Sequence, residues 1–301
     1  MGHVPLSVCF AKWLITVGTK QTNATLEINA GQRFKFGANW TRFLSVLDGE
    51  RILEAEESIK EMLGIASLDG LRFLDIGSGS GLFSLAARRL GATVHSFDFD
   101  PQSVACTQEL KRRYYPNDAA WHVEEGSVLD RDFLHSLGEF DIVYSWGVLH
   151  HTGAMWVGIE NALRSVAGAG GKLIIAIYND QGWKSHLWWL IKCLYNRLPR
   201  FTRAPFVGMV TALTHFLTIV KYTIRLTPMI AIAPLLSRKR ARGMSAKYDK
   251  TDWIGGFPYE FASFETLKSY LEARGFTVIH AKRTVTLGCN ELALQRTTCA
   301  E

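Results

Sequence analysis

Apolar residues follow two different spacings along the chain. Between residues 72 and 178, apolar runs of four to seven residues alternate with longer segments in which apolar residues recur every three or four positions. The short runs are typical of buried strands and the longer segments of amphipathic helices. Their alternation predicts a parallel, doubly wound α/β sheet. The predicted strands are Arg72–Ile76, Thr93–Phe97, Ala120–Val123, Phe140–Ser145 and Lys172–Tyr178, and the predicted helices are Leu82–Leu90, Pro101–Tyr114 and Met155–Val166.

The alternation stops after the fifth predicted strand and resumes near the end of the chain. Residues 181–236 are helix-like, apolar and basic, with no strand signal. Ser263 can cap a helix that continues to Ala273, and residues 276–282 and 291–295 read as two more strands. The pattern therefore predicts one Rossmann-like α/β domain with a seven-stranded, mostly parallel sheet and a helical insertion before the last two strands.

The remaining segments complete the expected organisation. Residues 39–63 read as helical with a break near Asp48–Gly49. The N-terminal stretch is moderately apolar, but Lys12 interrupts it and no small-residue cleavage site follows, which favours a loose tail or an extra strand over a signal peptide. We expect an N-terminal tail (1–35), a helical lid (36–70), a core (71–180), a basic helical insertion (181–250) and a C-terminal part of the core (251–301).

Composition narrows the class of protein. Hydrophobic residues make up 48% of the 301 residues and charged residues 21%, which fits a globular chain. The five cysteines include no CxxC pair, so the sequence favours neither a disulfide framework nor a metal site, and a reducing cytoplasm is the expected setting.

A glycine-rich loop follows the first predicted strand. Residues 77–81 read GSGSG and open a helix, where glycines allow a close approach to a ligand and the first helical N–H groups face it. Asp98 ends the second strand and suits the two hydroxyls of a ribose. Leu82 stands where a dinucleotide fingerprint has glycine or alanine, which favours S-adenosylmethionine (SAM) over NAD as the ligand. The alternative is a tight strand–helix turn without a ligand.

Four motifs carry a resemblance to a known family. They are LDIGSGSG at 74–81, TVHSFDFDP at 93–101, EEGSVLD at 124–130 and FDIVYSWGVLHH at 140–151. In this order they resemble the motifs of class I SAM-dependent methyltransferases, nearest to the branch with quinone-biosynthesis and small-molecule enzymes. The resemblance covers residues 71–178 closely and 261–294 loosely.

The resemblance implies a set of SAM-binding residues. It places Asp75 and the loop at the methionine end, Asp98 at the ribose, Phe99, Ser127 and Val128 around the adenine, and Trp146 near the methionine or the methyl group. Two positions depart from the family pattern: Ser127 replaces an aspartate that bonds the adenine, and Ala169 replaces the proline of a turn. The implied cofactor residues are Asp75, Gly77, Ser78, Gly79, Gly81, Asp98, Phe99, Ser127, Val128 and Trp146.

Candidate catalytic and substrate residues cluster beside these motifs. His150 and His151 follow the fourth strand, and a histidine has a suitable pKa to act as a base toward a hydroxyl nucleophile. The alternative is that the pair only orders its loop. Trp40, with Asn39 beside it, can line a lid or serve in packing. Tyr178 and Asn179 leave the fifth strand at the edge where open α/β sheets bind ligands, so we expect one of them to contact substrate.

The insertion differs in charge from the rest of the chain. Residues 182–250 hold thirteen Lys and Arg residues and one acid, Asp249, so the segment carries +12 and the remainder −6. Tryptophans beside cations suit a helix on an anionic membrane surface. A cap over the active site is the alternative reading, and contact of residues 238–242 with nucleic acid is a third.

The leading prediction is a SAM-dependent methyltransferase acting on oxygen or carbon of a small or lipid-like acceptor. The alternatives are RNA or protein methylation, and a SAM-binding, membrane-associated module without catalysis. The expected location is cytoplasmic, with peripheral contact at the inner face of a membrane. The sequence leaves the acceptor and the oligomeric state open.

Overall fold

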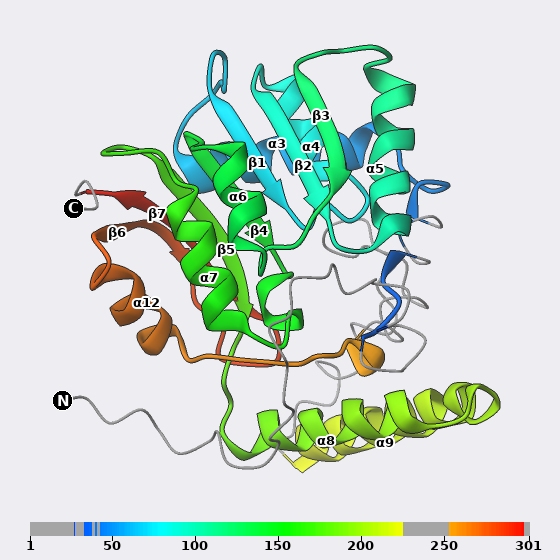
Figure 1. The fold of residues 1–301 in the computed structure, drawn as a ribbon. Coiled ribbons are helices and arrows are strands. Elements are labelled where there is room, and N and C mark those ends of the chain that lie inside the picture. Colours follow the sequence, from blue (N-terminus) through cyan, green and yellow to red (C-terminus); the bar gives the residue numbers. More distant parts are fainter. Residues whose placement is uncertain (1–26, 28–32, 38–39, 41–42, 225–252, 298–301) are drawn as a thin grey trace.

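The computed structural model describes residues 27, 33–37, 40, 43–224 and 253–297. Their centre is a seven-stranded sheet with the strand order β3-β2-β1-β4-β5-β7-β6 (Figure 1). All neighbours pair in parallel except β7, which runs antiparallel to both β5 and β6. The strands are β1 (Arg72–Ile76), β2 (Thr93–Asp98), β3 (Trp121–Glu125), β4 (Ile142–Trp146), β5 (Lys172–Tyr178), β6 (Phe276–Lys282) and β7 (Cys289–Arg296). The predicted fold, with helices inserted before the last two strands, is confirmed.

The helices begin and end where the sequence supplies caps. The Asp100 side chain accepts from the Gln102 N–H at the start of α5, with Pro101 in the first position, and Ser263 caps α12 in the same way. Gly64 ends α3 in a left-handed conformation. The helices are α3 (Gly49–Leu63), α4 (Leu82–Arg89), α5 (Pro101–Tyr114), α6 (Arg131–Leu137), α7 (Met155–Arg164), α8 (Trp183–Arg197), α9 (Arg200–Ile224) and α12 (Phe264–Glu272), with a short 3₁₀ turn η1 (Leu149–His151).

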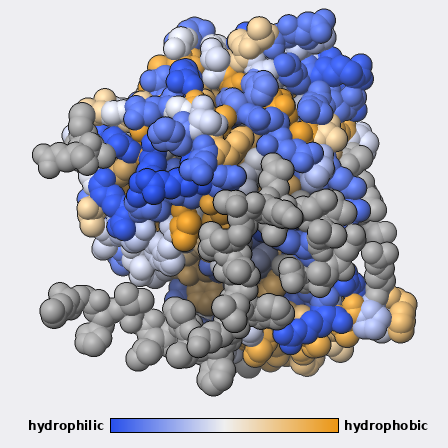
Figure 2. Space-filling model, in the orientation of Figure 1, coloured by the Kyte–Doolittle hydropathy of each residue, from blue (hydrophilic) through white to orange (hydrophobic). Residues whose placement is uncertain are grey.

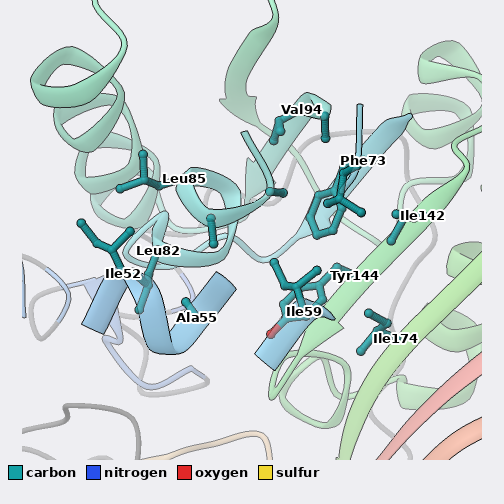
Figure 3. Close-up of a cluster of buried hydrophobic side chains, with 14 of the residues drawn as sticks. Ile52, Ala55, Ile59, Phe73, Leu82, Leu85, Val94, Ile142, Tyr144 and Ile174 are labelled. Carbon is teal, nitrogen blue, oxygen red and sulfur yellow. The ribbon is translucent and has the colours of Figure 1, made fainter. Parts of the chain in front are cut away.

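Both faces of the sheet are buried. Along β1, Phe73 points into a core with α3 and α4, and the next residue, Leu74, points into a second core with α7 and α12. Figure 3 shows the first core, where Ile52 of α3 lies near Leu82 and Leu85 of α4 and Ile59 lies near Tyr144 of the sheet. Burial on both faces explains why the strands read as continuous apolar runs rather than as an alternation.

Several elements differ from their predicted bounds by one or two residues. Strand β4 runs from Ile142 to Trp146 rather than from Phe140 to Ser145, because Phe140 forms an isolated bridge with Val166 instead of joining the ladder. Helix α6 was not predicted. It has one buried residue, Leu134, and is capped by Asp130, which accepts from the Phe133 N–H. A helix this short has too few apolar positions for a periodic signal.

The described part of the insertion, up to residue 224, forms two helices joined by Leu198 and Pro199. Arg203 of α9 donates to the carbonyls of Leu198 and Asn196, at the C-terminal end of α8, and so holds the two helices together. Predicted helical residues after Ile224, the basic cluster at 238–242, Asn39 and most of the predicted tail lie outside the described residues.

Candidate active site

A cavity of about 410 Å³ lies at the carboxyl edge of the sheet. Its volume is in the range of small-molecule sites, roughly 300–1,000 Å³. Its floor comes from the ends of β1, β2 and β4, the strands that surround the point where the strand order reverses. Predicted residues that line it are Trp40, Asp75, Gly77, Ser78, Gly79, Asp98, Phe99, Ser127, Val128, Trp146, His151 and Tyr178.

The glycine loop is held in a conformation that excludes side chains. Gly77 and Gly79 have φ of +76° and +56°, which glycine adopts without strain. A Cβ atom on Gly77 would lie 2.5 Å from the Val148 side chain, and one on Gly79 would lie 3.0 Å from the Trp40 indole. The backbone of the loop therefore forms the cavity surface itself.

Asp98 connects the glycine loop to the end of β2. Its carboxylate accepts from the Gly79 N–H (2.9 Å) and from the Asp100 N–H (2.9 Å). A carboxylate has about four acceptor positions, so two stay available toward the cavity. Burial raises the pKa of Asp98 to about 6, against the lowering effect of the two backbone bonds. The group is thus ionised at neutral pH and protonated in mild acid.

Asp75 ends a chain of buried hydrogen bonds that crosses the sheet. The Trp121 indole N–H donates to Ser96 Oγ (2.9 Å), Ser96 donates to Ser84 Oγ (2.8 Å), and Ser84 donates to Asp75 Oδ2 (2.5 Å). Burial raises the pKa of Asp75 to about 7, and the Ser84 bond opposes that shift. The chain fixes the orientation of the carboxyl group beneath the glycine loop.

The charges around the cavity fit SAM. Four carboxyl groups line it, those of Glu54, Asp75, Asp98 and Asp100, against two guanidinium groups, Arg33 and Arg51. SAM carries a positive sulfonium and a positive ammonium group, whereas a dinucleotide carries a negative pyrophosphate. An excess of carboxyl groups beside a glycine loop therefore favours SAM.

The two adjacent histidines have different surroundings. His151 lines the cavity, and its Nδ1 lies 2.5 Å from the Pro258 carbonyl oxygen, to which it donates. That bond places the remaining lone pair on Nε2. Burial, together with the nearby Lys192 cation, lowers the pKa of His151 to about 3, so the ring is neutral at physiological pH.

His150 faces away from the cavity. Its ring stacks on Tyr178 with centroids 3.9 Å apart, and its Nδ1 accepts from the Tyr178 N–H at 3.3 Å. Burial, first among the causes, lowers its pKa well below the usual value. The structure thus brings one of the two predicted histidines to the cavity and places the other in the support of β5.

Two further predicted residues do not line the cavity. The Asn179 side chain accepts from Asn290 Nδ2 (3.0 Å) and belongs to the junction of β5 and β7. Gly81 turns the chain into α4, where a Cβ atom would meet the Thr107 backbone at 2.9 Å. Both positions shape the elements that carry the site.

The N-terminal segment crosses the carboxyl edge of the sheet. Arg33 Nη1 donates to the His151 carbonyl (2.9 Å), and its guanidinium lies 4.6 Å from the centre of the Phe99 ring. The Gly37 N–H donates to Asp100 Oδ2 (3.0 Å). Sequence reasoning missed Arg33, which it assigned to a tail, and also Trp253, which lines the cavity from the far side of the insertion. Patterns among neighbouring residues do not predict contacts between residues more than a hundred positions apart.

One group of possible metal ligands lies outside the cavity. His95, His122 and Glu124 on β2 and β3 place ligand atoms within 4.8 Å of one another. His95 Nε2 and Glu124 Oε1 are 2.8 Å apart and form a cross-strand pair. None of the three lines the cavity, so this cluster belongs to the sheet and not to the site.

Comparison with known proteins agrees with this geometry. Residues 74–173 match the family described as "Methyltransferase domain". The chain is 41% identical over 73 residues to a ribosomal protein L11 methyltransferase of Methylococcus capsulatus (24% of this chain, 25% of the relative). It is 31% identical over 122 residues to a ubiquinone biosynthesis O-methyltransferase of Caulobacter (38% of this chain, 44% of the relative). The chain thus spans less than half the length of these curated relatives.

A solved structure shares the fold over most of the chain. Magnesium protoporphyrin IX methyltransferase from Synechocystis, solved with bound SAH, aligns with a TM-score of 0.52 and 15% identity, covering 91% of this chain and all of that one. At this identity the likeness shows the fold alone. Residues 74–173, which include the glycine loop, Asp98 and β4, match the methyltransferase domain family, and the chain as a whole shares the fold of this solved structure.

Proposed function

We propose that the protein transfers the methyl group of SAM to oxygen or carbon of a small, apolar acceptor. The proposal rests on a set of aromatic rings that line the cavity, which we call the aromatic wall. This surface is largely apolar, whereas the glycine loop is polar. Four rings and one imidazole of this wall line the same cavity as the loop: Phe34, Phe36, Tyr178, Trp253 and His151.

The rings of the wall contact one another in sequence. Phe34 and Phe36 have centroids 4.9 Å apart, as do Phe36 and His151. His151 and Tyr178 follow at 5.4 Å, and Tyr178 and Trp253 at 5.4 Å. Such contacts are within the range of favourable aromatic pairs. His151 thus lies between aromatic rings in the middle of a largely apolar surface, which suits an acceptor with a hydroxyl on an apolar body.

The chain's own residues then position the acceptor and remove a proton. SAM supplies an electrophilic methyl group on its sulfonium. The neutral His151 ring accepts a hydrogen bond from the acceptor's O–H at Nε2, while its Nδ1–H stays bonded to Pro258. With a pKa of about 3 it is a weak base, so it takes up the proton as the O–CH3 bond forms and the S–CH3 bond breaks, when the acceptor oxygen becomes strongly acidic. The positive charge that forms on the ring is stabilised by that carbonyl and opposed by Lys192 and Arg33. Residues 33–37, which cross this edge of the sheet, exclude water from the aligned groups.

The relatives fit more than one acceptor. One is named for methylation of a ribosomal protein and one for methylation in ubiquinone biosynthesis. The aromatic wall supports the small apolar acceptor, since a peptide side chain would present a polar backbone to these rings.

A turnover assay with labelled SAM tests this proposal. The acceptors are phenols and hydroquinones with alkyl chains of increasing length, and ribosomal protein extract in a parallel arm. We expect methylation of the phenolic acceptors, with kcat/KM rising with chain length. Methylation of the extract with no turnover of any phenol would overturn the proposal in favour of protein methylation.

The affinity for SAM should depend on pH through Asp98. Because the raised pKa of Asp98 lies at about 6, its carboxylate is ionised above that pH and becomes protonated below it. If the ionised form binds the ribose hydroxyls, the Kd for SAM rises by about tenfold per unit as the pH falls below 6. Asp75, whose pKa is raised to about 7, adds a further rise that begins near pH 7. Calorimetry at pH 5, 6, 7 and 8 measures this. A Kd that is unchanged between pH 5 and 8 would remove Asp98 from the binding site.

A further inference from the structure

Helix α8 exposes mostly apolar side chains and buries three polar ones beside the aromatic Trp188 and Tyr195. Ser185, Lys192 and Asn196 are buried against the protein. Lys192 Nζ donates to the Trp253 carbonyl and lies 4.8 Å from the centre of the Tyr259 ring. The outward positions are mostly apolar, with Trp183 71% exposed. The exposed apolar side chains of α8 are Trp183, Leu187, Trp189, Leu190 and Leu194.

Helix α9 also exposes mostly apolar side chains. Its half-buried positions include Arg203, Thr211, Thr214 and His215, whereas its exposed positions between residues 201 and 220 are apolar except Thr218. Phe201 is 83% exposed and Phe216 is 62% exposed. The segment Phe201–Val220 is long and apolar enough to cross a membrane, with 6% of its most apolar part buried. Large exposed apolar side chains of α9 are Phe201, Met209, Leu213, Phe216, Leu217, Ile219 and Val220.

The two helices form one outward apolar face over the same part of the molecule. They lie side by side below the carboxyl edge of the sheet in Figure 1, and apolar atoms gather along the lower edge of the same view in Figure 2. Contiguous apolar surface of this extent marks a docking site. Because the exposed positions of both helices are mostly apolar, the face is suited to an apolar environment rather than to water.

Charge and aromatic residues identify the occupant. Residues 183–224 contain no Asp or Glu and six Lys or Arg residues. Lys184 and Arg197 of α8 are exposed beside the exposed tryptophans Trp183 and Trp189. Tryptophans and cations together are typical of the interface of an anionic bilayer. A protein partner would be expected to meet a face with both signs of charge at its rim.

The packing of α9 decides how the helix meets the bilayer. Phe206, Val207 and Val210 pack into a cluster with Trp188, Tyr195 and Tyr259. One side of the helix is thus attached to the protein along its first half. A helix with one apolar face and one protein-packed face lies in the plane of the interface and does not cross the bilayer.

We propose that α8 and α9 dock on an anionic lipid bilayer with their exposed apolar face in the interface. A second inference rests on the proposed function: the acceptor is a membrane-resident molecule that reaches the cavity from the bilayer. The aromatic wall links the two, because Tyr178 and Trp253 line the cavity and also pack with Trp188 of α8.

Co-sedimentation with vesicles tests the docking without any turnover. The probes are vesicles of phosphatidylcholine alone and of phosphatidylcholine mixed with phosphatidylglycerol, each at low and high salt. We expect binding to both, stronger to the anionic vesicles, with high salt reducing anionic binding to the neutral level but not to zero. Salt screens the cations and leaves the apolar contact in place.

Two substitutions on the apolar face and one control sharpen the test. Leu213→Glu and Phe216→Glu change side chains that are 55% and 62% exposed, and each should lower the vesicle partition coefficient by about tenfold. Val285→Glu introduces the same charge at an 82% exposed apolar residue between β6 and β7 and should leave binding unchanged. If the two α9 variants bind as the wild type does, or if no vesicle binds the protein, the proposal is wrong. Light scattering that shows a dimer, converted to monomer by the same variants without vesicle binding, would assign the face to a second copy.

The delivery of the acceptor has its own readout. A long-chain phenol in vesicles and a chain-free phenol in solution are compared as acceptors. The α9 variants should lose about tenfold in rate on the embedded acceptor and keep the rate on the soluble one. Equal rates of wild type and variants on both acceptors would overturn delivery from the bilayer. Vesicle binding with no turnover of either acceptor would instead contradict the proposed function.

Discussion

Replacing His151 by Gln is expected to lower kcat by about 10²–10⁴-fold, with SAM affinity near that of the wild type. The reason is that Nδ1 donates to the Pro258 carbonyl, so Nε2 is the atom left to accept the acceptor's proton within the cavity. A glutamine side chain can reach the same space but cannot take up a proton at neutral pH. Single-turnover kinetics with saturating SAM would measure the loss in the chemical step.

Two matched histidine substitutions separate catalysis from folding. His150→Gln changes a ring stacked on Tyr178, so it should lower the free energy of unfolding by about 1–3 kcal/mol and leave kcat of the folded protein within a few-fold. His135→Gln changes an exposed residue of α6 and should change neither quantity. A His151→Gln variant with normal kcat would show that alignment alone carries the reaction.

Asp98→Ala is expected to weaken SAM binding by about 1.5–3 kcal/mol, which is roughly 10–150-fold in Kd. The substitution removes the acceptor groups that face the ribose and also the bonds to the Gly79 and Asp100 N–H groups that hold the loop. Calorimetry of the purified variant against SAM at pH 7.5 measures the change.

Glu139→Ala serves as the control for loss of a carboxylate, because Glu139 is exposed in the turn before β4 and does not line the cavity. Its SAM affinity should match the wild type. Asp98→Asn distinguishes charge from loop geometry, since it keeps the size of the side chain. If Asp98→Asn and Asp98→Ala both bind SAM as tightly as the wild type, the ribose is held by other groups.

The cofactor half of the site follows from local sequence, which is why it could be predicted. The loop at 77–81, the strands on either side and Asp98 all lie between Arg72 and Asp98, and short-range patterns predict them. The pair at 150 and 151 shows the limit of such reasoning. Adjacent residues in a 3₁₀ turn point in different directions, so that only the fold decides that His151 faces the cavity and His150 faces Tyr178.

The acceptor half of the site depends on long-range packing. Arg33 and Trp253 come from segments on opposite ends of the chain, and no periodicity connects them to the sheet. The insertion is an intermediate case. The helices of the insertion could be predicted from composition, but the sequence of a helix does not show which of its faces turns outward. Here the polar Lys192 and Asn196 turn inward because they bind carbonyls of the segment that follows the insertion.

Because hydrogen bonds connect Trp121 to Asp75, the Trp121 indole N–H responds to a ligand bound beside Asp75. All the hydrogen bonds of this chain of donors point toward the carboxyl group, so a change in charge at Asp75 changes the polarisation of each donor in turn. A cation bound above the glycine loop favours the ionised carboxylate and strengthens the chain. The indole N–H resonance of Trp121, a buried residue that does not line the cavity, would then shift downfield as SAM is added. Occupancy of the site could thus be followed by NMR in the native chain, with no label at the site itself.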